Sequence, residues 1–588
     1  MFTVTTGADA GLGSLREGIN QSNMGNVSTI NIAVPLVTLT SAELLIINDV
    51  TIVGAPSEVT RDPNAIPFRI FNIQGNNPQT FIVSFSNLTI SQGLNNTDDG
   101  GGINVANATV ILTNVIVSNN ESTLGTGGGI NATNSLLTLI NSTVSNNIIA
   151  SDGAGIYIAG LSLTLVNTTV TGNFTDGTTG GGDGGGIFAS GNPENITTLS
   201  ITNSTISNNT SIAGGGILTG FVNLTITDST ISNNISGDGG GINTTATNSI
   251  ITNSTISNNT TSGTDSGGGI TIDNDPGNTT TLINVTISEN NYNGNGNGSG
   301  GIVVRDGIVS LGNTIVANNT APASNPFSPD VGGIFISLGN NLIGNGSGSI
   351  GFINGVNGDQ VGTTANPINP LLGPLQFNGG PTQTMALQFG SPAINAGNNN
   401  LISSEFDQRG PPFIRINPPG GIIDIGAFEF QFFIICYSGK SKILTKNILT
   451  KKISTTNAED VIAGVHEVLN VNNNSFVPVK INIVTGVVNN FMLIKKNAIG
   501  INQPIDDFYV TPGHEIMINN KIIKAKYIPQ ARRVYVEPQK VYSICTDQRC
   551  PIKVNGLNVM TWGYNKWIVN TKKKGINWID NKVNNNLI

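Results

Sequence analysis

The side chains best suited to covalent chemistry lie late in the chain. All three cysteines (Cys436, Cys545 and Cys550) and both histidines (His466 and His514) follow residue 435. A free thiol, with a pKa near 8.5, is only a few per cent thiolate at neutral pH, and an amide nitrogen leaves poorly unless an acid such as histidine supplies a proton. Three cysteines cannot all pair within one chain, so at least one free thiol is expected. Cys436 follows the apolar stretch FFII and fits either a reactive thiol or an inert buried one.

The first cysteine coincides with a change in composition. Residues 1–435 contain six Arg, no Lys and 26 acidic residues, a net charge of −20, whereas residues 436–588 contain 21 basic and nine acidic residues, a net charge of +12. This change predicts a domain boundary just before Cys436. Apart from the run Lys572–Lys574, the lysines of the basic part are scattered. Scattered lysines indicate a solvated surface, so we expect no nucleic-acid partner.

Two landmarks repeat in the acidic part. GGGI or a close variant ends at Ile103, Ile130, Ile156, Ile187, Ile217, Ile242, Ile270 and Ile302, a period of 25 to 32 residues. Between these stand NSTVSNN from Asn141, NSTISNN from Asn203 and Asn253, and DSTISNN from Asp228. A fixed order of landmarks at a period of 25 to 32 residues indicates a solenoid built from one repeated unit.

The residues within each repeat predict short β-strands. LTLIN from Leu137, LTLVN from Leu163 and LTITD from Leu224 alternate apolar residues with polar ones and are rich in β-branched types. Three short strands per repeat suit one coil of a parallel β-helix, with successive coils about 4.8 Å apart. We therefore predict an all-β rod of roughly a dozen coils, about 60 Å long.

Stacked coils also give the polar landmarks a structural role. The Asn residues at positions 120, 147, 173, 209, 234 and 259 should lie above one another, so that each amide bonds to the next coil. The NST sequons follow automatically from such a repeat, which favours a structural role over glycosylation. TDDGGG from Thr97 and SGDGGG from Ser236 have the composition of calcium loops, but tight turns are the favoured interpretation, and no metal is expected.

Three stretches resemble a known family. FTVTTGADAGLGSLREGINQSN (Phe2–Asn23), LGPLQFNGGPTQTMALQFGSPAINAG (Leu372–Gly397) and DQRGPPF with DIGAFEF (Asp407–Phe430) resemble the right-handed parallel β-helix proteins of the choice-of-anchor type. The resemblance covers residues 1–430. It implies a right-handed β-helix of a large surface or secreted protein, followed by an attachment module.

The module after the junction at residues 431–435 resembles a second family. CYSGKSKILT, EDVIAGVHEVL, YVTPGHEIMI, YSICTDQRC and GLNVMTWG resemble the all-β Hint domain of hedgehog proteins and inteins, in the form found in giant DNA viruses. The resemblance covers residues 436–588. It implies that Cys436 attacks the Ile435 carbonyl, cleaving the Ile435–Cys436 bond through a thioester. It also implies that Thr511 and His514 supply a T-x-x-H motif that polarises and protonates that bond.

The sequence leaves three functional interpretations open. The first is a structural or adhesive β-helix, of a virion or an extracellular surface, that binds a carbohydrate or another cell-surface ligand and carries a self-cleaving module. The second is a polysaccharide lyase or hydrolase, which the absence of Lys and His before residue 435 disfavours. The third is an inactive Hint-like module that serves only as an anchor or interaction module. No cofactor, membrane span or signal peptide is expected, and the oligomeric state stays open.

Overall fold

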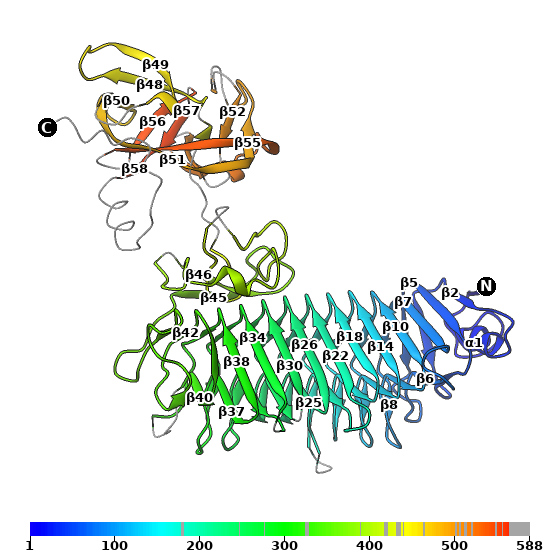
Figure 1. The fold of residues 1–588 in the computed structure, drawn as a ribbon. Helices are drawn as coiled ribbons and strands as arrows, with labels where there is room; N and C mark the ends of the chain where they lie inside the picture. The colour runs from blue at the N-terminus through cyan, green and yellow to red at the C-terminus, as the bar shows by residue number, and fades with distance from the viewer. Residues whose placement is uncertain are drawn as a thin grey trace. The chain divides into compact units, whose positions relative to one another are not determined.

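The structure is a computed structural model. It describes residues 1–177, 181–245, 247–275, 277–323, 329–388, 390–416, 421–430, 437–438, 440–461, 465–499, 503–504, 507–510, 514–518, 521–546, 550–555 and 557–563. The chain forms two compact units, residues 1–430 and 431–588. The first is a parallel β-solenoid and the second is built almost wholly from antiparallel strands (Figure 1), which confirms the predicted all-β class.

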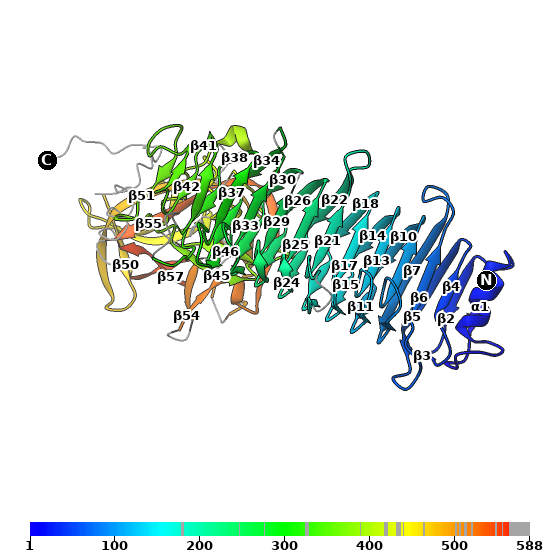
Figure 2. The ribbon, with the colours of Figure 1, turned by 90° about the horizontal axis from the view of Figure 1, so that it is seen from below.

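A short helix closes the N-terminal end of the first unit. Helix α1 (Leu15–Asn23) is capped at its N-terminus by Ser14, whose hydroxyl accepts a hydrogen bond from the Glu17 N–H at 3.2 Å. Leu15 and Ile19 are buried and belong to the same apolar core as the first coils. The helix therefore covers an apolar end of the solenoid that would otherwise face water (Figures 1 and 2).

Each central coil has four strands, which we number as faces one to four. In one coil these are β13 (Ile130–Thr133), β14 (Leu136–Ile140), β15 (Thr143–Ser145) and β16 (Ile148–Ile149). Each pairs in parallel with its counterpart in the next coil, as Ile130 does with Ile156 and Thr143 with Thr169. The prediction of three strands was wrong because the stretch from Thr143 bends again at Asn146 and leaves a separate two-residue strand.

The strands of the first unit fall into three large sheets and one hairpin. Face one forms a sheet of twelve strands, one per coil: β4 (Leu44–Ile46), β6 (Phe71–Gln74), β9 (Ile103–Ala106), β13, β17 (Ile156–Ala159), β21 (Ile187–Ser190), β25 (Ile217–Gly220), β29 (Ile242–Thr245), β33 (Ile270–Asp273), β37 (Ile302–Asp306), β40 (Val331–Ile334) and β43 (Ser349–Ile350). Faces two and three share one sheet because β5 (Val50–Arg61) and β7 (Ile82–Ser91) run through both. Its other strands are β1 (Phe2–Val4), β2 (Thr29–Ile32), β3 (Leu36–Leu39), β10 (Thr109–Thr113), β11 (Ile116–Ser118), β14, β15, β18 (Ser162–Val166), β19 (Thr169–Thr171), β22 (Thr197–Thr202), β23 (Thr205–Ser207), β26 (Val222–Thr227), β27 (Thr230–Ser232), β30 (Asn248–Thr252), β31 (Thr255–Ser257), β34 (Thr279–Ile283), β35 (Thr286–Ser288), β38 (Ile308–Gly312), β39 (Ile315–Val316), β41 (Ile336–Gly339), β42 (Leu342–Ile343) and β44 (Gln360–Val361). Face four consists of β8 (Leu94–Asn95), β12 (Glu121–Ser122), β16, β20 (Phe174–Thr175), β24 (Thr210–Ala213), β28 (Ile235–Asp238), β32 (Thr260–Thr261) and β36 (Asn291–Tyr292). The hairpin is formed by β45 (Leu372–Gln376) and β46 (Thr384–Leu387). A 3-10 turn, η1, spans Asn399–Leu401.

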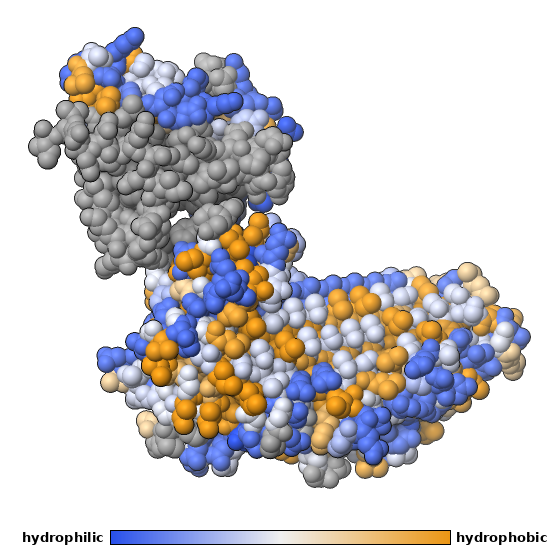
Figure 3. Space-filling view, viewed as in Figure 1, coloured by the Kyte–Doolittle hydropathy of each residue, from blue (hydrophilic) through white to orange (hydrophobic). Residues whose placement is uncertain are grey.

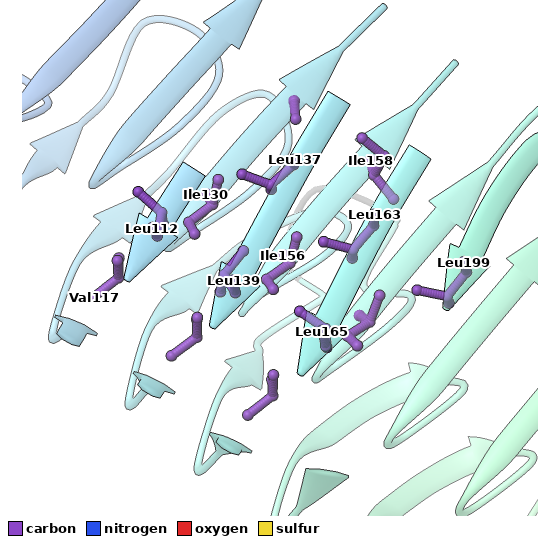
Figure 4. Close-up of a cluster of buried hydrophobic side chains, with 14 of the residues drawn as sticks. Leu112, Val117, Ile130, Leu137, Leu139, Ile156, Ile158, Leu163, Leu165 and Leu199 are labelled. Carbon is purple, nitrogen blue, oxygen red and sulfur yellow. The ribbon is translucent and has the colours of Figure 1, made fainter. Parts of the chain in front are cut away.

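The core is a set of columns of aliphatic side chains. Leu137 stacks on Leu163, and Leu139 on Leu165, in strands that pair in register (Figure 4). All four are at most 1% exposed. Because a buried Leu contributes about 1.5–3 kcal/mol relative to an exposed one, these columns are the main source of stability of the rod.

The repeated NSTVSNN motif makes two corners and one strand. Asn141 and Asn146 have positive φ angles of 50° and 54°, a conformation that Asn tolerates better than most residues, and they turn the chain at either end of β15. Between them Val144 is buried, whereas Thr143 and Ser145 are partly exposed. The motif thus places the hydroxyls of Thr143 and Ser145 on the outside of face three, whereas Ser142 is buried.

The last Asn of the motif forms a buried amide ladder. Asn120 Nδ2 donates to Asn147 Oδ1 at 3.0 Å, and the same bond continues at 2.9–3.0 Å through Asn173, Asn209, Asn234, Asn259, Asn290 and Asn319. This bonding confirms the predicted stacking of the first six residues. The final acceptor is Asp330 Oδ1, at 2.9 Å from Asn319 Nδ2.

The second unit is a sheet of twelve short and long strands. Its long strands, β51 (Ser475–Ile494) and β55 (Ala531–Thr546), pair along most of their length. The others are β47 (Tyr437–Ser438), β48 (Lys442–Asn447), β49 (Ile453–Asn457), β50 (His466–Asn470), β52 (Phe508–Val510), β53 (Glu515–Ile518), β54 (Lys521–Lys524), β56 (Pro551–Val554), β57 (Leu557–Met560) and β58 (Trp562–Gly563), with 3-10 turns η2 (Ala458–Asp460) and η3 (Ala525–Tyr527). Across the described parts of both units, no helix has the length and apolar character to cross a membrane.

Candidate functional site

Most of the predicted cleavage site lies outside the described residues. This applies to Ile435, Cys436 and Thr511. The fourth predicted residue, His514, is described: it is 1% exposed and directly precedes β53. Its carbonyl accepts the N–H of Ala525 at 2.7 Å, which ties the backbone of His514 to the turn η3.

The neighbours of the predicted site residues pair within one sheet. Tyr437, which follows Cys436 in the sequence, pairs with Val510, which precedes Thr511. On its other side Tyr437 pairs with Tyr542 of β55. Since paired strands lie about 4.8 Å apart, the described backbone brings the segment that starts at Tyr437 alongside the segment that ends at Val510.

Cys550, a thiol that the structure describes, occupies a structural position. Cys550 is a free cysteine, 5% exposed, whose Sγ lies 3.6 Å from Thr546 Oγ1 and 3.8 Å from Thr561 Oγ1. The backbone of Cys545 pairs with Trp562 inside the sheet. Burial makes Cys550 poorly placed to accept an acyl group from another part of the chain.

A second polar site lies where residues 372–430, here called the docking segment, pack on the solenoid. Gln408 is fully buried: its Oε1 accepts the Thr255 hydroxyl at 2.5 Å, and its Nε2 donates to Thr230 Oγ1 at 3.0 Å. Thr230 in turn donates to the Gln383 carbonyl at 2.6 Å. The docking segment therefore binds the outward hydroxyls of face three.

Two buried arginines fix the same segment. Arg415 donates to Asn253 Oδ1 at 2.7 Å and to the Gly426 carbonyl at 2.8 Å. Arg409 pairs with Asp407 at 2.5 Å, and its guanidinium lies 3.8 Å and 3.7 Å from the ring centroids of Phe413 and Phe428. Arg409 and Phe428 belong to the DQRG and AFEF stretches that carried the family resemblance, and Arg415 lies between them. The sequence did not indicate that these residues act as a clamp.

The clamp also contains a pair of buried carboxyl groups. Glu429 Oε2 accepts the Asp424 N–H at 2.9 Å, and Asp424 accepts the N–H groups of Asn395 and Phe430 at 2.6 and 2.5 Å. Burial, and then the neighbouring Asp424 charge, raise the pKa of Glu429 far above its usual range. Burial also raises the pKa of Asp424. Burial therefore favours the protonated form of both carboxyl groups of this pair.

The acidic turns that have the composition of calcium loops already have protein partners. Asp98 pairs with Arg69, and Asp99 Oδ1 accepts the Thr126 N–H at 2.7 Å. Asp238 binds Arg305 through both oxygens at 2.8 and 2.9 Å. Among the described residues, no group of three or more His, Cys, Asp or Glu side chains is placed to hold a metal ion.

The fold and these sites define a parallel β-helix protein whose chain continues into an antiparallel β-unit. No family model and no curated protein matches the chain. Among solved structures, the chain is similar to tailspike protein 3 of bacteriophage CBA120, at 11% identity and a TM-score of 0.34. The match covers 63% of this chain and 64% of the tailspike chain, less than two thirds of its length.

Proposed function

We propose that the protein is a structural and adhesive β-helical rod of a virion or extracellular surface whose C-terminal unit cuts the chain between Ile435 and Cys436. The main observation in support of the proposed cleavage is the pairing of Tyr437 with Val510. It joins the segment that follows the predicted nucleophile to the segment that precedes the predicted T-x-x-H motif. The resemblance of the two units to choice-of-anchor β-helices and viral Hint domains supports the same assignment.

The proposed reaction is an acyl shift followed by hydrolysis. The Cys436 sulfur attacks the Ile435 carbonyl carbon, the bond from that carbon to the Cys436 nitrogen breaks, and the nitrogen takes up the proton that the thiol gave up, delivered through His514. Thr511 polarises the bond before it breaks. Water then attacks the thioester, which releases an Ile435 carboxylate and restores the thiol.

The charges of the rod favour adhesion over catalysis on its surface. All six arginines of residues 1–430 bind groups of the protein itself: Arg16, Arg69, Arg305 and Arg409 pair with carboxylates, and Arg61 and Arg415 donate to carbonyl oxygens. This unit has no Lys. A lyase that abstracts a proton beside a sugar carboxylate needs a cation to stabilise the developing negative charge. The six arginines already bind groups of the protein and therefore do not supply this cation.

Intact-mass measurement of the purified full-length chain tests the cleavage. The wild-type chain is expected to yield a fragment of residues 1–435, and Cys436→Ala is expected to stay whole. Cys550→Ala serves as the thiol control and should cleave like the wild type, because Cys550 lies buried elsewhere in the sheet. Full-length wild-type chain under every condition would instead favour an inactive module that acts as an anchor.

A further inference from the structure

Face three of the solenoid is a regular array of hydroxyl and amide groups. Thr143, Thr169 and Thr205 stack in one outward column, and Ser145, Thr171 and Ser207 form the next. Exposed amides flank the rungs at the corners: Asn114, Asn119, Asn141, Asn146, Asn167 and Asn208. The array repeats about every 4.8 Å and carries no charge between these corners.

The C-terminal half of the same face is already occupied by this chain. Thr230, Thr255 and Thr286 continue the first column, and each is at most 1% exposed. They bind the docking segment through the Gln383 carbonyl, the Gln408 side chain and the Ala427 N–H, the last at 3.0 Å. The contacts show which chemistry this column binds: uncharged groups that donate and accept hydrogen bonds.

The N-terminal half of the face offers the same groups to solvent. Thr143, Thr169 and Thr205 are partly exposed, in contrast to their covered counterparts. In Figure 1 the docking segment, with β45 and β46, lies over the edge of the coils that contain β34 and β42. A hydrophilic row follows the same edge of the solenoid in Figure 3.

An apolar strip adjoins this open half, one corner away. Phe174 and Ile148 are paired neighbours on face four and are 43% and 40% exposed. A sugar presents hydroxyl groups at its edges and C–H groups on its ring faces. A hydroxyl and amide array beside an exposed aromatic ring matches both features.

The charge of the unit narrows the class of ligand. The net charge of −20 on the first 435 residues repels an anionic polymer and also disfavours a second copy of the same surface. The backbone groups of face three are used by the parallel coils, so an added strand cannot pair with them. An uncharged polymer that bonds through its own hydroxyls fits these conditions.

We propose that the open half of face three, from β15 to β23, binds an extended, uncharged polysaccharide lying along the solenoid axis. Successive coils then meet successive sugars, since the rise per coil is close to the length of one hexose in an extended chain. The inference rests on the adhesive part of the proposed function and names its ligand class. Self-cleavage is independent of it and is read from the intact mass of the same sample.

Affinity electrophoresis of the full-length chain tests the proposal. The gels contain hydroxyethyl cellulose, mannan or dextran, with polygalacturonate as the anionic comparison. At least one uncharged polysaccharide should retard the wild type. The triple variant Thr143→Val, Thr169→Val, Thr205→Val should lose about tenfold or more in affinity, because each lost hydrogen bond contributes about 0.5–1.5 kcal/mol. Phe174→Ala should weaken binding as well.

The matched control changes three outward hydroxyls on face two: Thr138→Val, Thr164→Val and Thr225→Val. This variant should bind like the wild type. Equal retardation of both triple variants would show that face three is not the binding site, while the proposed adhesive function of the rod would still stand. No retardation by any uncharged polysaccharide, or retardation by polygalacturonate alone, overturns the ligand class. Self-association in light scattering that only the face-three variant loses would assign the face to a second copy.

Discussion

Asparagine residues both link successive coils of the rod and form its corners. In an inner ladder residue such as Asn209, Oδ1 accepts from the backbone and side chain of the preceding coil, while Nδ2 donates to the next coil and to a backbone carbonyl. Every polar atom of such an amide is therefore used inside the core. The same residue type stands at the corners because Asn adopts positive φ at low cost. One residue type thus performs two separate tasks in one heptapeptide.

Asn209→Asp tests the ladder without changing the shape of the side chain. The new carboxylate keeps its contacts with Asn173 but loses both donors, so that its oxygen faces Asn234 Oδ1 and the Val170 carbonyl. We expect a loss of about 3 kcal/mol or more in the free energy of unfolding at neutral pH, measured by urea denaturation. The neighbouring change Asn208→Asp, on the exposed corner, should have little effect.

The pH dependence of Asn209→Asp has a definite sign. Burial raises the pKa of the new carboxyl above its unfolded value, so the folded state favours the protonated form. Part of the lost stability should return as the pH falls from the raised folded-state pKa towards the unfolded value of about 4, below which the recovery is complete, since the protonated group donates one hydrogen bond. An unfolding midpoint equal to that of Asn208→Asp at every pH would contradict the ladder.

The sequence predicts the ladder but not its end. Repetition places Asn120 through Asn259 at equivalent positions, and stacking then follows from the fold class. Asp330 lies only 11 residues after Asn319, outside the period, so nothing in the spacing marks it as the last acceptor. Burial raises its pKa to about 6.

At the scale of elements, the docking segment is the part whose structure is hardest to predict from the sequence. Its residues have no period, and their partners lie roughly 150 residues earlier in the chain, as with Gln408 and Thr255. The strands of the coils, in contrast, follow from alternation and β-branching. The number of strands per coil was wrong because alternation does not reveal a corner at which Asn adopts positive φ.

The buried carboxyl pair predicts that docking weakens as the pH rises. The folded-state pKa of Glu429 lies above its unfolded value, so its contribution to stability is complete below about pH 4.3 and is lost as the pH rises through the folded value. Trypsin should therefore cut after Arg409 and Arg415 faster at about pH 9 than at about pH 6, after correction with a small substrate. Both arginines are at most 4% exposed when docked.

Glu429→Gln should reduce this pH dependence, because an amide oxygen can still accept the Asp424 N–H without titrating; the titration of Asp424, whose pKa burial raises to about 7, remains. Glu405→Gln, an exposed position in the same segment, is the matched control and should behave like the wild type. If cleavage after Arg409 accelerates with pH equally in the wild type and both variants, a group other than Glu429 causes the pH dependence.

At the scale of the whole molecule, the chain joins two units whose amino-acid compositions differ. Residues 1–430 form a capped, acidic rod in which polar side chains are fixed in repeating columns. Residues 431–588 form a separate β-unit that contains every cysteine and histidine. The charge change at residue 435 predicted a boundary from composition alone. What composition does not provide is the strand pairing between Tyr437 and Val510, which depends on contacts across some 70 residues of sequence.

Trapping with hydroxylamine tests the central claim most directly. Purified full-length chain is incubated with hydroxylamine and the intact mass is measured over time, beside Cys436→Ala. If Cys436 forms a thioester with Ile435, the wild type yields residues 1–435 with a C-terminal hydroxamate, and the Cys436→Ala chain yields none. A hydroxamate at another residue, or equal cleavage of both chains, would contradict the account.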